Sequence, residues 1–167
     1  IEAQNSLLNG ASLIASRLHL GGEYPLDTQT AQDCLEGALM FKLLMPANVY
    51  TNVPPMKFLV AEETQKHGEK PENTEDDKSL TMAKYEAAYK VIEHNYSLAV
   101  TQLKAKLHLQ SNTEAEKLLF GPKSELFQKI PSGADDGYAD YNKGDTKIAG
   151  GFQSKEPGIN VGKFLAT

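Results

Sequence analysis

The chain has 167 residues, a formal net charge of −5 and a single cysteine. A chain of this length buries roughly 68–70% of its unfolded surface, so it needs neither a disulfide nor a metal to fold. One cysteine excludes an intramolecular disulfide and any zinc site with two or more cysteines. The mild acidity argues against nucleic-acid binding, which needs a concentrated basic surface. No run of 18 apolar residues is present, so the sequence predicts no membrane span.

The first part of the chain predicts helices. Between residues 3 and 20, apolar side chains recur at steps of three and four, which is typical of one face of a helix, and the glycine pair at 21–22 ends it. A second, more apolar helix begins after a capping residue, Asp27, Thr28 or Thr30, and ends at Pro46.

The next part of the chain is less regular. Residues 56–67 predict a third, shorter helix, with a short strand at 58–60 as the alternative. Residues 69–79 hold five acids, two lysines and no large apolar side chain, and this composition predicts an exposed acidic loop.

A long helix is predicted at 81–110. Its apolar residues alternate at steps of three and four, as in a coiled-coil seam, and no glycine or proline interrupts it. The seam consists of Met82, Tyr85, Tyr89, Ile92, Tyr96, Ala99 and Leu103. Two short helices, 113–120 and 124–130, are expected to fold back on it.

The last segment, 131–167, has a different composition. It contains seven of the 13 glycines with single large apolar residues between them. This pattern predicts an irregular strap, with a short hairpin from 147–149 and 158–165 as an alternative. We therefore expect a mainly α fold: an irregular bundle of about four helices in a domain at 1–130, crossed by the strap. The strap belongs either to the same domain or to a partner interface.

No combination of residues indicates a particular chemistry. Glu63 and His67 share a helical face, but this spacing is typical of a solvated surface pair. Cys34 lies among apolar residues, which favours an inert thiol. Residues 140–145 resemble half of a calcium loop, but the position of the twelfth-residue glutamate is taken by Gly151. We expect no metal, no cofactor and, on balance, no enzymatic activity.

Two functions remain. The first is a non-enzymatic interaction or assembly protein, such as a subunit of an exported complex, that binds a protein partner through the long helix and the strap. The alternative is a helical protein that binds a small ligand in an apolar pocket lined by tyrosines, between the second helix and the long helix. The candidate binding residues are Tyr85, Tyr89, Tyr96, Tyr138, Tyr141 and Phe152. Because the sequence begins at Ile1 and not at Met, we expect a processed N-terminus and an exported or membrane-associated protein.

Overall fold

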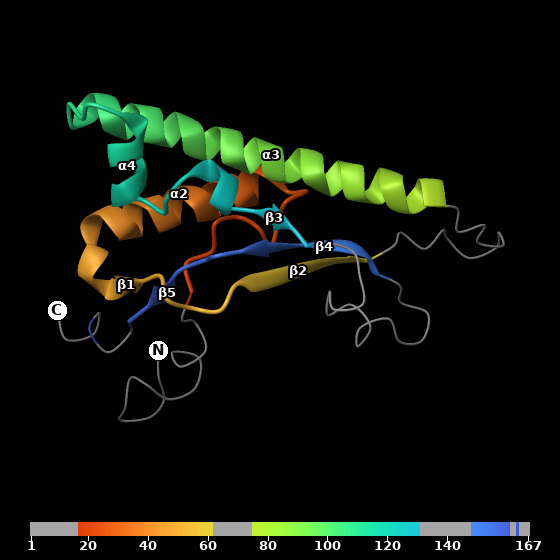
Figure 1. Cartoon of the computed structure of the whole chain (residues 1–167). Coiled ribbons are helices and arrows are strands. Elements are labelled where there is room, and N and C mark those ends of the chain that lie inside the picture. The colour runs from red at the N-terminus through yellow and green to blue at the C-terminus, as the bar shows by residue number, and fades with distance from the viewer. Residues whose placement is uncertain (1–16, 62–74, 131–147, 161–162, 164–167) are drawn as a thin grey trace.

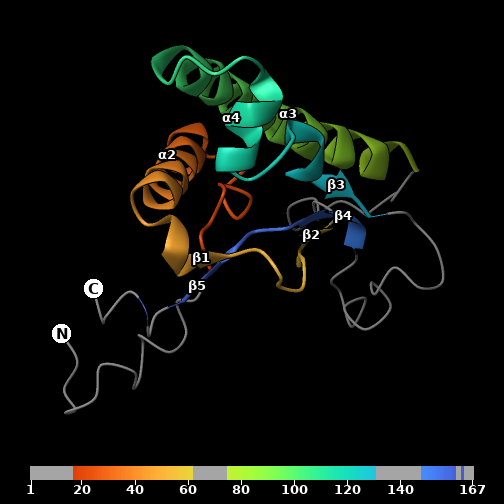
Figure 2. The ribbon, with the colours of Figure 1, turned by 60° about the vertical axis from the view of Figure 1, so that its left-hand side comes forward.

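The computed structural model describes residues 17–61, 75–130, 148–160 and 163, with the backbone alone for 75–79. Its elements form two layers, with α-helices above a layer of short strands (Figure 1). The long helix α3, Glu75–Lys106, runs along the top of the molecule, and α2, Thr28–Leu44, lies between it and part of the strand layer. The short helix α4, Asn112–Leu118, follows the turn at the end of α3 (Figure 2).

Local signals explain where these helices begin and end. Asp27 caps α2, because its carboxylate accepts a hydrogen bond from the backbone N–H of Thr30 at 3.1 Å. Helix α2 stops one residue before the 3-10 turn Pro46–Asn48. A capping box holds the start of α4, where Ser111 and Glu114 each satisfy a backbone N–H of the other. These contacts replace the hydrogen bonds that the first turn of a helix lacks.

The strands form two antiparallel sheets. In one sheet β4, Ile148–Ser154, lies between β2, Met56–Ala61, and β3, Gln128–Lys129. In the other, β1, Val49–Tyr50, pairs with β5, Gly158–Ile159. The register of β2 and β4 sets Phe58 opposite Phe152 and shifts between Val60 and Ala61. A 3-10 turn, Lys123–Glu125, leads from α4 toward β3.

An aromatic cluster joins α3 to the sheet. The ring centroid of Tyr89 on α3 lies 4.4 Å from the ring centroid of Phe152 on β4 and 4.6 Å from that of Phe127. The helix approaches the sheet closely at Gly150, where an added Cβ would lie 2.6 Å from the sulfur of Met82. Because glycine has no side chain, β4 can pass directly beneath α3.

The prediction of a mainly α bundle with an irregular strap is wrong. The described residues form three α-helices and two antiparallel sheets, so the fold is a mixture of helix and sheet. The strand alternative at 58–60 is confirmed, and the helix predicted at 56–67 is not formed over its described part, 56–61. Strand β4, which we expected in a strap, is the central strand of its sheet. The glycines of this segment were interpreted as a sign of irregular structure. In the structure they permit close packing, because β4 is buried between α3 and its neighbouring strands.

Several boundaries also differ from the predictions. Residues 17–20, the end of the first predicted helix, are not helical, and Arg17 forms a β-bridge with Gly158. Helix α3 begins at Glu75, within the segment predicted as a loop. The helix at 124–130 is replaced by the 3-10 turn and β3, and β4 and β5 belong to different sheets, so they form no hairpin together. The remainder of the first helix, residues 69–74 of the loop, and the Glu63–His67 pair lie outside the described residues.

Candidate functional site

Helix α3 has an inner face that belongs to the core. Tyr96 is fully buried, and its hydroxyl donates a hydrogen bond to the carbonyl of Gly121 at 2.5 Å and accepts one from the N–H of Phe120 at 3.2 Å. The hydroxyl of Tyr89 donates to the carbonyl of Gly22 at 3.1 Å. Burial raises the pKa of Tyr96 to about 12 and also raises the pKa of Tyr89. Both hydroxyls therefore stay protonated and tie α3 to neighbouring segments.

The opposite face of α3 is exposed and also carries apolar residues. We call it the outer stripe: eight exposed residues whose steps alternate between four and three. They are Leu80, Lys84, Ala87, Val91, His94, Leu98, Thr101 and Ala105. The exposed fractions are 70% for Leu80, 45% for Val91 and 49% for Leu98. At 100° per residue this stripe points away from Tyr89, so α3 is apolar on two opposite faces. Figure 1 shows no described element above α3.

Open grooves lie beside the helices, and two of them have contrasting linings. One, of about 700 Å³, lies between α2 and α3 and combines amide side chains such as Gln32 and Asn95 with Leu35, Leu39 and Leu98. Asn95 donates a hydrogen bond across it to Gln32 at 2.6 Å. The other, of about 450 Å³, is lined by aromatic and charged residues, and we call it the aromatic groove. Its aromatic residues are Tyr24, Phe58, Tyr85 and Tyr89.

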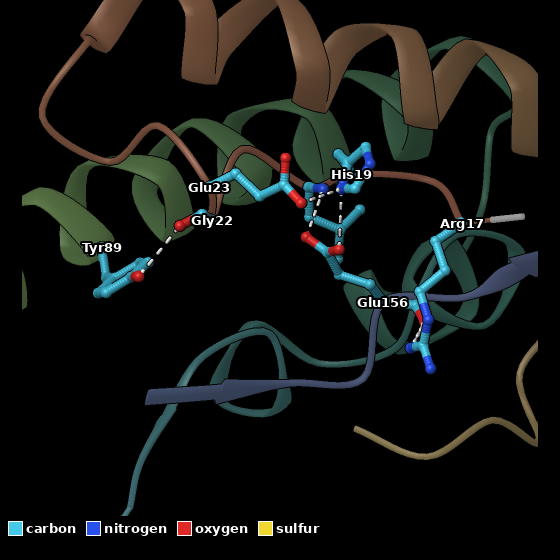
Figure 3. Close-up of polar contacts among 7 residues, drawn as sticks. Arg17, His19, Gly22, Glu23, Tyr89 and Glu156 are labelled. Atoms are coloured by element: carbon cyan, nitrogen blue, oxygen red, sulfur yellow. Dashed lines mark hydrogen bonds and ion pairs between the residues drawn. The ribbon is translucent and has the colours of Figure 1, made fainter. Parts of the chain in front are cut away.

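A polar cluster surrounds a buried carboxylate, that of Glu156 (Figure 3). The side chain of Glu156 is fully buried, accepts a hydrogen bond from the N–H of Leu20 at 2.9 Å and lies 3.2 Å from His19 Nδ1, within hydrogen-bond distance. His19 also lies 3.4 Å from Glu23, and Arg17 donates to the backbone carbonyl of Glu156 at 3.1 Å. Burial raises the pKa of Glu156, although the Leu20 N–H and His19 lower it in part.

This cluster holds two distant segments of the chain together. The N–H of Leu18 donates to the carbonyl of Pro157, and Tyr89 bonds to Gly22 on the same N-terminal segment.

A carboxylate that orients a histidine is also part of many catalytic sites, but these also need a nucleophile or a substrate pocket. Burial and the charges of Glu23, Glu156 and Asp33 raise the pKa of Cys34, so its thiol is not activated. The arrangement is that of a structural cluster.

Within the described ranges, no group of three or more His, Cys, Asp or Glu side chains is placed to hold a metal ion. The calcium-like segment 140–145 lies outside those ranges.

The structure places the predicted site residues in different surroundings. It brings together Tyr85, Tyr89 and Phe152 in or beside the aromatic cluster, whereas Tyr96 lies further along α3 and contacts the turn after α4. Tyr138 and Tyr141 lie outside the described residues. A binding role for these residues stays a prediction.

Sequence reasoning missed two features. The outer stripe has the spacing of a heptad repeat, but the stronger apolar stripe on the same helix obscured it. Glu156 carries no local signal, because its hydrogen-bond partners are 136 and 137 residues away in the chain.

Comparisons with known proteins add no relative. Neither the scan against family models nor the searches of curated proteins and solved structures found a match. Among the described helices, none is both long and apolar enough to cross a membrane.

Proposed function

We propose that this protein is a non-enzymatic interaction or assembly protein that binds another protein through the outer stripe of α3. The observation that carries the proposal is the two-faced character of this helix. Its inner face already supplies the core, so the apolar residues of the outer stripe are not needed for the fold. Exposing Leu80, Val91 and Leu98 to water has a cost in solubility, and apolar stripes of this kind are typical of binding surfaces.

The chemistry of the polar residues supports the same proposal. Glu156 and His19 contact other parts of the chain, and the pKa of Cys34 is raised and not lowered. These groups have the properties of structural residues. A role for the C-terminal strap in binding stays a prediction, because Tyr138 and Tyr141 are outside the described residues.

Photo-crosslinking tests this function in cells that naturally make the protein. A photoreactive amino acid is placed at Val91 or at Leu98 in the full chain, and at Leu44 as the control. Leu44 is 71% exposed at the end of α2, so it has comparable access to solvent but lies on another helix. We expect discrete protein adducts from positions 91 and 98 and none from 44. Equal labelling at all three positions, or no adduct at 91 and 98, would contradict the proposal.

The aromatic groove favours a second candidate function, the binding of a small aromatic ligand. Its lining includes Tyr24, which is 48% exposed, together with Tyr85 and Phe58. Aromatic rings of this kind stack on flat ligands. NMR titration with a set of aromatic fragments would show shifts around Tyr24 that Tyr24→Ala abolishes and Tyr50→Ala, an exposed tyrosine outside this groove's lining, preserves. Shifts that both variants preserve would reject this candidate.

A further inference from the structure

The outer stripe of α3 has the pattern of a coiled-coil seam. From Leu80 to Ala105 it spans about 39 Å of helix at 1.5 Å per residue. Five of its eight positions are apolar and three are polar, and all eight are exposed. Spacing of this kind is typical of a helix that pairs with a second helix.

We propose that the partner is a second copy of this chain, and that the two α3 helices pair antiparallel along their outer stripes. This inference rests on the proposed function and identifies the partner. A twofold axis crosses the helix between Val91 and His94, so each residue of the stripe meets a different residue of the second copy.

The side-chain sizes in this register are complementary. Leu80 faces Ala105 of the second copy, and Ala87 faces Leu98 of the second copy. Each large side chain therefore meets a small one, and because the axis is twofold, each of these contacts occurs twice. Val91 faces His94 in the two central layers. Facing large and small residues allow two helices to pack closely without voids.

The charges select the antiparallel direction. Helix α3 begins with Glu75-Asp76-Asp77 and has Lys104 and Lys106 in its last turn. Antiparallel pairing sets the acidic end of each helix beside the basic end of the other, which is attractive, and it also opposes the helix dipoles. Parallel pairing in register would set the two acidic ends together and the two basic ends together.

The residue pairs formed along the stripe also favour antiparallel pairing. Parallel pairing would set Lys84 against Lys84 and His94 against His94, whereas antiparallel pairing sets Lys84 against Thr101 of the second copy. Beside the stripe, Lys90 then lies next to Ser97 of the second copy. No two like charges meet in the antiparallel arrangement.

Sedimentation equilibrium of the full chain, at concentrations up to about 1 mM, tests the dimer. We expect Leu98→Glu to weaken dimerisation at least about tenfold, because it buries a charge in two symmetric layers. The control Leu44→Glu introduces the same charge on α2 and should change the dimer constant less than about twofold. We expect circular dichroism to show that both variants are folded, because both sites are exposed. A monomeric wild type, or equal effects of the two variants, would overturn the inference.

Cysteine crosslinking tests the register in a Cys34→Ser background. Mixing chains that carry Ala87→Cys with chains that carry Leu98→Cys should yield a disulfide-linked pair on oxidation, and neither variant alone should crosslink efficiently. Crosslinking of Leu98→Cys with itself would instead indicate parallel pairing and refute the proposed arrangement. A monomeric chain whose photo-crosslinks at 91 and 98 lead to a different protein would refute the homodimer and leave the proposed function intact.

Discussion

Replacing single tyrosines of α3 by phenylalanine measures how much each hydroxyl group of its inner face contributes to the free energy of unfolding. Tyr96→Phe removes a hydroxyl that bonds to both Gly121 and Phe120. Each hydrogen bond contributes about 1 kcal/mol net, so the free energy of unfolding should fall by about 2 kcal/mol, or slightly more because two backbone groups lose their partner. For a protein of this size, that loss lowers the melting temperature by about 4–8 °C.

Two matched variants give reference values for the loss of unfolding free energy. Tyr89→Phe removes the single bond to Gly22 and should cost about 1 kcal/mol. The hydroxyl of Tyr85 has no hydrogen-bond partner among the described residues, so Tyr85→Phe should stay within about 0.5 kcal/mol of the wild type. Urea denaturation, with the slope of the transition as a check on two-state behaviour, gives the three values. An order other than Tyr96, Tyr89, Tyr85 would refute this account of the inner face.

Three further predictions concern the rest of the fold. Burial raises the pKa of Glu156, so its ionisation reduces stability as the pH rises through that raised value; Glu156→Gln should therefore gain stability relative to the wild type between about pH 5 and about pH 8. Urea denaturation at both pH values checks this, and a constant difference between the two proteins would contradict it. Gly21→Ala should cost more than about 2 kcal/mol, because Gly21 has a φ of 92° and its Cβ would lie 2.6 Å from a backbone oxygen, whereas Gly37→Ala, in the open on α2, should stabilise by about 0.5–1 kcal/mol. Thermal melts of the pair separate these effects, and a loss in both would disagree with the geometry. Ser111→Ala removes the cap of α4 and should cost about 1 kcal/mol, which hydrogen exchange of the α4 amides would localise; unchanged protection there would count against the capping role.

The three described α-helices could largely be predicted, whereas of the strands only β2 was predicted, as an alternative to a helix. Periodicity and the Asp27 cap located α2, and alternating steps located the inner face of α3. Strand β4 was missed because its glycines reduce its apolar periodicity, and because its pairing with β2 joins residues such as Phe58 and Phe152 that are far apart in the chain. No local signal reports such a pairing.

The candidate site shows the same division. The outer stripe from Leu80 to Ala105 is present in the sequence as a heptad pattern, since helix periodicity is a local property. The tertiary structure places the Tyr89 face in the core, where Tyr89 packs on Phe152, and leaves Leu98 on the outer stripe exposed.

The sequence by itself determined helix α2 with its Asp27 cap and the apolar spacing of the inner face of α3, because neighbouring residues set helix geometry. Only the tertiary structure decided that Glu156 is buried against His19 and Leu20, and that a glycine-rich segment forms the central strand of a sheet. These features depend on contacts between residues distant in the chain, whose free energy comes from burial in a common core and not from any local preference.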